Sequence, residues 1–209
     1  GLFMSATEAH NKANVNRTRA ESFSDLSAIL RDAVAAGVKV RFNLSCCFHC
    51  PFEGVVPEAT ALEWIGRAAE LDPAMEIGIA DTTGNAAPDQ VARVVGQAVR
   101  AWPAPDGRSR MAFHGHDTYG MGVANVAAAY GAGARVIDSA AGGLGGCPFA
   151  PGATGNVAME DVVWLFRRMG VETGVDWAKL LSAADLAASV PGGMPGGRMR
   201  AVAAARLAA

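Results

Sequence analysis

The sequence lacks several features that mark membrane, nucleic-acid-binding and exported proteins. No run of about 18 residues is apolar without interruption, so we expect no membrane-spanning helix. The formal net charge is only −2, which argues against a nucleic-acid-binding surface because such a surface needs a clustered excess of basic residues. The first residues show no basic segment followed by an apolar one, so we expect no signal peptide.

Cysteine is also scarce. Cys46, Cys47 and Cys50 lie within five residues, and the fourth cysteine, Cys147, lies far along the chain. This spacing is not that of a disulfide framework, and together with the missing export signal it favours a reducing, cytoplasmic setting. A structural zinc ion needs four ligands from two separated pairs, and no second pair lies near Cys46. We therefore expect the three clustered cysteines to be packing or loop residues.

What the sequence does contain is apolar residues in a regular order. It is 51% hydrophobic with 25 glycines in 209 residues, the composition of a globular protein with a buried core. Apolar runs predict strands at residues 38–45, 75–80, 110–113 and 135–139. Helical spacing predicts helices at residues 18–37, 57–71, 88–102, 123–130 and 157–169, the first opened by a capping box from Thr18 to Glu21.

This order of elements predicts an α/β fold. Strands that are apolar throughout and alternate with helices pair in parallel, in either a doubly wound sheet or a barrel. Asp81, the pair His114 and His116, and Asp138 fall at the carboxyl ends of different strands, which in a barrel converge on one face, so we favour a TIM (β/α)8 barrel. Residues 191–209 show no core-forming pattern, and we expect a flexible or peripheral tail there.

Two histidines are the sharpest local signal. His114 and His116 stand two residues apart on a predicted strand, so their side chains point to the same side of the sheet. That geometry would let both imidazoles bind one cation. Two polar residues that only hydrogen-bond to neighbours at the end of a strand fit the spacing equally well.

A glycine-rich loop precedes the fourth cysteine. Residues 142–146 include four glycines, which let the backbone approach a ligand closely, but no Gly-Lys-Ser/Thr follows as in a phosphate-binding loop. Cys147 on such a loop is a candidate reactive thiol, or else a loop residue without a role. Asn156 has the spacing of a helix N-cap, the interpretation that we prefer from the residues alone, although its amide oxygen also suits a hard cation.

Taken together, these stretches resemble the 3-hydroxy-3-methylglutaryl-CoA lyase family, which belongs to the metal-dependent TIM-barrel lyases and Claisen-type synthases. The glycine–cysteine loop, joined to the block around Asn156, separates the lyases from the synthases. The matching segments are SATE at 5–8, NVN at 14–16, CPFEG at 50–54, DTTG at 81–84, FHGHDTYG at 113–120, GGLGGCPFA at 142–150 and GATGNVAMED at 152–161.

The resemblance implies a lyase that cleaves 3-hydroxy-3-methylglutaryl-CoA, or a close 3-hydroxyacyl-CoA, to acetyl-CoA and acetoacetate. It implies a divalent cation, Mg²⁺ or Mn²⁺, held by His114, His116 and Asn156. Cys147 would be the acid, Asp81 would orient or assist proton transfer, and His114 would also take part in it. The resemblance further implies a bacterial enzyme that is a homodimer or homotetramer with an acyl-CoA substrate. From the charge, the hydropathy and the missing export signal we expect a cytoplasmic protein with no nucleic-acid or membrane partner.

The sequence also departs from the family. Gly78 stands where the family has a serine, and Cys47-Phe48-His49 is unusual, so the acyl group is open. The acidic metal ligand and the adjacent arginine of the first barrel strand have no counterpart before Ser5. We therefore expect residues 1–190 to be the C-terminal part of a single barrel, about strands 4–8, with the N-terminal strands missing. A Claisen-type synthase or aldolase, and an inactive barrel fragment, remain the alternatives.

Overall fold

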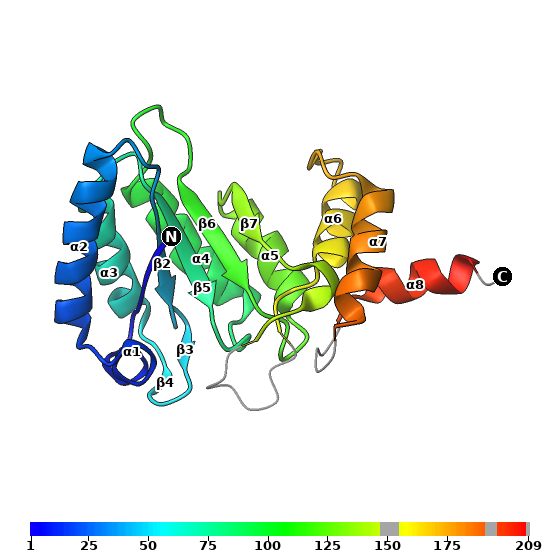
Figure 1. The fold of residues 1–209 in the computed structure, drawn as a ribbon, viewed down its shortest axis with the longest axis horizontal. Coiled ribbons are helices and arrows are strands. Elements are labelled where there is room, and N and C mark those ends of the chain that lie inside the picture. Colours follow the sequence, from blue (N-terminus) through cyan, green and yellow to red (C-terminus); the bar gives the residue numbers. More distant parts are fainter. Residues whose placement is uncertain (147–154, 191–195, 208–209) are drawn as a thin grey trace.

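The computed structural model describes residues 1–146, 155–190 and 196–207, and its centre is a parallel sheet. The strands are β1 (Leu2–Ser5), β2 (Arg41–Ser45), β5 (Glu76–Asp81), β6 (Met111–Gly115) and β7 (Val136–Asp138). Their order across the sheet is the order along the chain, with every neighbouring pair parallel (Figure 1). A separate short hairpin of β3 (His49–Cys50) and β4 (Gly54–Val55) follows β2.

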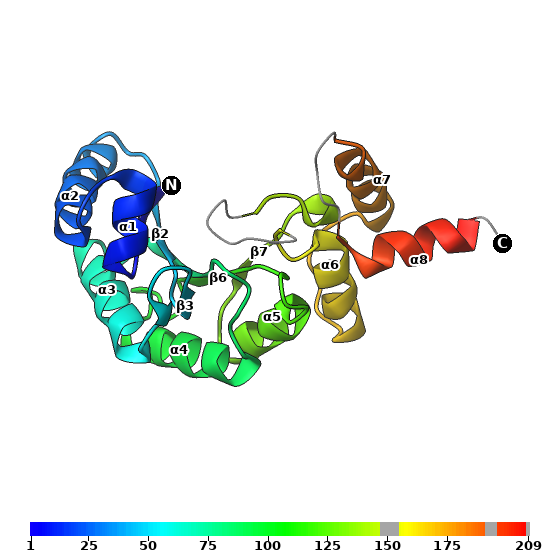
Figure 2. The ribbon, with the colours of Figure 1, turned by 90° about the horizontal axis from the view of Figure 1, so that it is seen from below.

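The helices are α1 (Glu8–Val15), α2 (Arg19–Ala35), α3 (Glu58–Leu71), α4 (Pro88–Ala101), α5 (Gly122–Gly131), α6 (Met159–Arg168), α7 (Trp177–Ala188) and α8 (Arg198–Leu207), with a 3-10 turn at Ala141–Gly143. Of these, α2 to α5 lie between strands in the chain and cover one side of the sheet (Figure 2). Figure 2 shows α2 to α5 following one another along the outer side of a curved sheet. A doubly wound sheet would carry helices on both faces, so this arrangement is the curved, singly covered one that a barrel requires.

The core lies between the sheet and these helices. Side chains alternate along the strands, and the apolar outward-facing side chains of the central strands β2, β5 and β6 are fully buried. That set comprises Phe42, Leu44, Ile77, Ile79, Met111 and Phe113. The capping box is present as predicted: the Thr18 side chain accepts from the backbone N–H of Glu21, and the Glu21 carboxylate accepts from that of Thr18.

The structure confirms the strands and helices that the apolar periodicity predicts, and it adds elements that the periodicity missed. These are β1, α1, the hairpin of β3 and β4, and α7. Strand β1 has one strand partner and four residues, too few for a pattern. Helix α1 buries the polar residues His10 and Asn11, so its buried side does not read as apolar. No helix in the part of the chain that the structure describes is long and apolar enough to cross a membrane.

The C-terminal tail carries helix α8 beyond the sheet (Figures 1 and 2). The backbone N–H groups of Arg198 and Met199 donate to the two carboxylate oxygens of Asp161 on α6. Charged capping of this kind favours a helix start because the first N–H groups of a helix have no partner within it. The described tail is therefore a peripheral helix held at its start.

Candidate active site

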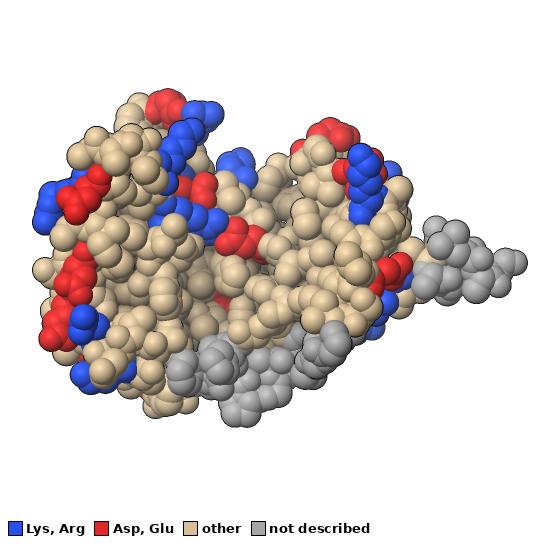
Figure 3. Space-filling view, in the orientation of Figure 1, with Lys and Arg blue, Asp and Glu red and all other residues tan. Residues whose placement is uncertain are grey.

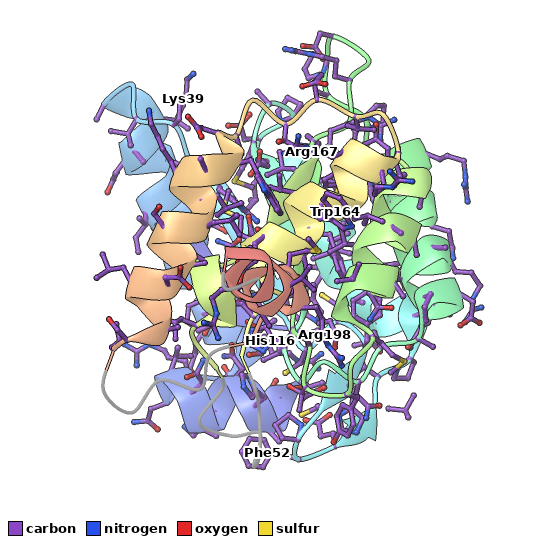
Figure 4. All side chains as sticks on the ribbon, turned by 90° about the vertical axis from the view of Figure 1, so that its right-hand side faces the viewer. Lys39, Phe52, His116, Trp164, Arg167 and Arg198 are labelled. Atoms are coloured by element: carbon purple, nitrogen blue, oxygen red, sulfur yellow. The ribbon has the colours of Figure 1, made fainter. Side chains whose placement is uncertain are left out.

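The two histidines of the β6 strand lie together at the carboxyl end of the sheet. The Nε2 atoms of His114 and His116 are 3.2 Å apart, and the ring centroids are 5.2 Å apart. The side chains thus face the same side, as the i, i+2 spacing predicts. Figure 4 shows His116 toward the end of the molecule that also carries α1 and Phe52. The pair therefore sits where an α/β sheet builds its reactive centre.

His116 is held neutral. Burial, and to a smaller extent the neighbouring His114, lowers the pKa of His116 to about 4. A neutral imidazole has a lone pair on one ring nitrogen, and that lone pair is what a metal ligand needs. Its Nδ1 atom is buried without a hydrogen-bond partner in the described ranges. His116 is therefore in the protonation state that a metal ligand needs.

Asn156 lies beside this pair. His116 and Asn156 form an isolated antiparallel bridge, so two distant segments meet at the histidines. The Asn156 Nδ2 donates to the carbonyl of Leu144 at 2.7 Å, while its Oδ1 is buried with no hydrogen-bond partner among residues 1–146, 155–190 and 196–207. The N-cap interpretation is wrong, because helix α6 begins at Met159 and its N-cap is Ala158. The amide oxygen is instead available to a ligand.

These atoms fit a divalent cation. Two ligands about 2.1 Å from an octahedral ion and at right angles to each other lie about 3 Å apart, close to the separation of the two Nε2 atoms. A buried orphan oxygen beside them supplies a third donor of the kind that Mg²⁺ and Mn²⁺ accept. No cluster of three His, Cys, Asp or Glu that would hold a metal occurs in the described residues, so two imidazoles and one amide are the donors found here.

Asp138 orients the first histidine. Its Oδ2 lies 3.2 Å from His114 Nδ1, and both its oxygens accept from the guanidinium of Arg41. Burial works against ionisation, but hydrogen bonds from His114 and Arg41 outweigh it and lower the pKa of Asp138 to about 2. An ionised acceptor at Nδ1 selects the tautomer that carries its proton there and leaves Nε2 free. The sequence placed Asp138 at this end of the sheet but gave no sign of Arg41.

The start of the glycine loop lies beside Asn156 and the histidine pair. Gly142, Gly143 and Gly145 all have positive φ, a conformation that suits glycine. The backbone N–H of Asn156 donates to the carbonyl of Gly145 at 3.1 Å, so the loop begins beside the candidate ligand. Cys147 itself lies outside the described residues.

Glu160 is a site residue that the sequence reasoning missed. Its side chain is fully buried, and its Oε2 accepts from the backbone N–H of Gly142 at 3.0 Å. Burial raises the pKa of this carboxyl. The signal in the sequence was a charged residue on the apolar side of a predicted helix, since Glu160 precedes the buried Val162 and Val163. Glu160 anchors the loop that leads to the cysteine.

Asp81 uses its carboxylate for the loop after β5. Its two oxygens accept from the backbone N–H groups of Asn85 and Ala86, and Asn125 donates to Oδ2 at 3.5 Å. Burial raises the pKa of Asp81 to about 6, against the hydrogen bonds that lower it. It follows Ile77 and Ile79 at strand spacing, on the face opposite His114. Its catalytic role stays a prediction.

The clustered cysteines pack as expected. Cys46, Cys47 and Cys50 are all buried. The thiol of Cys50 accepts from Thr7 Oγ1 at 3.1 Å, and burial raises the pKa of Cys47 to about 12, so that thiol stays protonated. A protonated buried thiol is a poor nucleophile and a poor metal ligand.

Comparison with known proteins agrees with this geometry. The family model described as HMGL-like matches residues 1–187. The chain is 43% identical over 176 residues to the hydroxymethylglutaryl-CoA lyase of Pseudomonas mevalonii, covering 84% of this chain and 56% of that protein. It is 40% identical over 183 residues to the Bacillus subtilis hydroxymethylglutaryl-CoA lyase, covering 88% and 60%. The chain thus spans less than two thirds of the length of these curated relatives.

Solved structures of hydroxymethylglutaryl-CoA lyases also match the fold of this chain. The crystal structure of the Bacillus subtilis HMG-CoA lyase superposes with a TM-score of 0.88 at 38% identity, covering 97% of this chain and 66% of that one. An HMG-CoA lyase from Acinetobacter baumannii, in complex with coenzyme A and 3-methylmalate, gives 0.84 at 35% identity, covering 94% and 63%. An α/β fold with a parallel sheet, two facing histidines at its carboxyl edge and these matches place the chain in the HMGL-like family.

Proposed function

We propose that this chain forms the catalytic portion of a lyase that cleaves 3-hydroxy-3-methylglutaryl-CoA, or a close 3-hydroxyacyl-CoA, to acetyl-CoA and acetoacetate. The observation that carries the proposal is the facing Nε2 pair of His114 and His116, with the orphan Oδ1 of Asn156 beside them. The relatives named above act as hydroxymethylglutaryl-CoA lyases by name, and one solved relative holds coenzyme A.

We further propose that the sheet is part of an eight-stranded barrel. The five parallel strands would be strands 4–8, in one domain over residues 1–190 with a peripheral tail at 191–209. Two facts support this: β1 and β7 are the two edges of a curved sheet, and the chain spans 56–60% of its curated relatives. Strands 1–3 of such a barrel would bring the acidic ligand and the arginine that the family resemblance implies.

The reaction needs three things from the protein. The tertiary hydroxyl must lose a proton, the substrate oxygens must be held while charge develops, and the departing thioester enolate must gain a proton. His114, His116 and Asn156 would hold Mg²⁺ or Mn²⁺, which supplies Lewis-acid polarisation when bound. His114 would also take part in moving the hydroxyl proton.

Cys147 would donate the proton to the enolate carbon. Its loop begins at glycines that lie against Asn156, and Glu160 holds Gly142 in place. The positive φ angles of Gly142, Gly143 and Gly145 are a backbone conformation that suits glycine at the start of this loop. Asp81 would act from behind the sheet by fixing the loop that follows β5.

A Claisen-type synthase or aldolase on the same fold is the second candidate. The lyase homologues disfavour it, as does the glycine–cysteine sequence in the loop. Cytoplasmic location and assembly as a dimer or tetramer stay predictions.

Mn²⁺ binding and acetyl-CoA release test the proposal. The purified chain should bind Mn²⁺, followed by its electron paramagnetic resonance signal, and His116→Ala should weaken binding at least 100-fold. His49→Ala is the matched control, because His49 lies on the separate β3 strand and should leave binding unchanged. Equal Mn²⁺ binding by the native chain, His116→Ala and His49→Ala would contradict the proposed metal site.

Lyase activity provides the second test of the proposed function. Acetyl-CoA release from 3-hydroxy-3-methylglutaryl-CoA should require Mn²⁺ and the polypeptide that supplies the remaining strands, and Cys147→Ala should abolish turnover while Mn²⁺ binding persists. Condensation of acetyl-CoA with a keto acid, without cleavage of the hydroxyacyl-CoA, would favour the synthase instead. Full turnover in the Cys147→Ala protein would remove the cysteine from its assigned role.

A further inference from the structure

Arg41 reaches across the inner face of the sheet. It lies at the start of β2, and its carboxylate partner Asp138 ends β7, with strands β5 and β6 between them. The guanidinium donates through Nη1 to Oδ1 at 2.9 Å and through Nη2 to Oδ2 at 2.6 Å, and Nη1 lies 3.3 Å from Glu76. Figure 3 shows basic and acidic side chains next to each other in the hollow between the strands and helices α6 and α7. A side chain can span several strands in this way because the sheet curves around it.

Gly78 leaves the passage for this side chain open. A Cβ atom at position 78 would lie 2.8 Å from Arg41 Nη2 and 2.5 Å from the side-chain oxygen of Asn43. Its register neighbour on β6 is Ala112, the smallest residue that has a side chain. Any larger residue at 78 must push the guanidinium or the Asn43 amide aside. The Cβ atom of the serine that the family resemblance places here would collide with both the Arg41 guanidinium and the Asn43 amide.

The chain of contacts ends on the candidate metal ligand. Asp138 Oδ2 accepts from Arg41 Nη2 and also lies 3.2 Å from His114 Nδ1. Two parallel N–H donors fix the plane of a carboxylate, which a single ammonium donor does not do. The orientation of that plane sets where Oδ2 meets the imidazole, and so where His114 Nε2 points.

We propose that Arg41 is a positioning residue for the site, holding His114 in its Nδ1–H tautomer through Asp138, and that Gly78 is the position that permits it. This inference rests on the proposed function, since it assigns Arg41 a purpose only if His114 is a ligand. Neither Arg41 nor Gly78 is one of the proposed ligands or proton donors. Their effect reaches the site through one carboxylate.

The first test needs no metal. The chain has four histidines, so long-range ¹H–¹⁵N spectra can report the tautomer of each one separately. The native chain should show His114 with its proton on Nδ1. Arg41→Lys keeps the charge but removes the two-donor contact, and Gly78→Ser blocks the passage, so each should shift His114 toward a mixture of tautomers.

The second test uses Mn²⁺ alone. Loss of an outer partner of a ligating histidine weakens metal binding about 10- to 100-fold, and we expect about 10-fold for Arg41→Lys and for Gly78→Ser. Arg93→Lys is the matched control: Arg93 also pairs with two carboxylates, Glu58 and Asp89, but on the exposed surface of α4. It should change neither tautomer nor affinity. The double variant of Arg41 and Gly78 should be no weaker than either single one, because both break the same contact.

The two arms separate the failure of this inference from the failure of the proposed function. If the native chain binds no Mn²⁺ but the His114 tautomer depends on Arg41, the positioning holds and the metal site fails. If Mn²⁺ binds through His116 and His114 keeps its Nδ1 proton in Arg41→Lys, the inference is overturned. Should Arg41→Lys lose its fold by circular dichroism, Gly78→Ala decides, and an unchanged tautomer in that folded protein also overturns it.

Discussion

The two faces of the sheet carry different kinds of residue. The outer face is apolar and fully buried against helices, with Phe42, Ile77 and Phe113 as its large members. The inner face carries ions and imidazoles, among them Arg41 and His114, which are part-exposed. Because side chains alternate along a strand, neighbours in sequence belong to opposite faces. The same five strands therefore provide stability on one side and chemistry on the other.

This separation has a consequence for substitution. A change on the outer face removes buried contacts from the core, whereas a change on the inner face removes a polar contact that water can partly replace. The effects on folding and on ligand binding should consequently come apart, even at adjacent positions. Three experiments test that separation, in decreasing order of their effect on stability.

The largest effect is expected on the outer face. Phe113→Ala should lower the free energy of unfolding by about 3–5 kcal/mol, because it empties a fully buried position that packs edge-on against Phe48. Urea unfolding followed by circular dichroism measures it. Phe113→Leu, which keeps most of the volume, should lose much less. A loss below about 1 kcal/mol in the alanine variant would mean that the outer face is not the core.

Opposite pH dependences are expected from one carboxyl on each face. Burial raises the pKa of Asp81 from 3.8 to about 6, so the folded chain keeps a proton that the unfolded chain has released. Stability from Asp81 is present below about pH 4 and is lost as pH rises through about 6, by about 3 kcal/mol. The pKa of Asp138 is lowered to about 2. Its contribution is present above about pH 4 and is lost as pH falls toward 2, by about 2 kcal/mol.

Urea unfolding at stepped pH separates the two carboxyls. Asp81→Asn should remove the loss of stability between about pH 4 and 6, and Asp138→Asn should remove the loss below about pH 4. Glu63→Gln changes an exposed residue of α3 and serves as the control. It should leave both pH-dependent losses of stability unchanged. Identical pH profiles in the native and both Asn variants would contradict the assignment.

The smallest effect on stability is expected at His114, which directly follows Phe113 in the chain. His114→Ala should lower the free energy of unfolding by about 1 kcal/mol or less, because the imidazole is about one third exposed and Asp138 keeps its contacts with Arg41. The same variant should lose Mn²⁺ binding. A destabilisation as large as that of Phe113→Ala would show that the inner face also holds the fold together.

The sequence predicted more of the fold than of the site. Continuous apolar runs such as residues 75–80 located β5, and the capping box at Thr18 located α2, because both signals are local. Strand β1 and helix α1 were not predicted, because the burial of β1 and of the polar side of α1 depends on what packs against them. The histidine pair was found because i, i+2 spacing on a strand fixes which way side chains point.

The remaining site residues needed three dimensions. Asn156 read as a helix cap until the structure showed the helix starting at Met159. Arg41 gave no signal, because it lies 97 residues from Asp138 and only the curvature of the sheet brings their side chains together. Gly78 read as a departure from the family until its missing side chain proved to be the space that Arg41 and Asn43 fill.

By itself, the sequence determined the alternation of strands and helices, the family and the two histidines, since each follows from periodicity or from a contiguous motif. Only the tertiary structure decided that the helices cover a single face, that Asp81 turns away from the histidines, and that Arg41 reaches Asp138. The physical reason is the same in each case. Local spacing fixes the direction of a side chain, but its partner depends on the strands and loops that folding brings beside it.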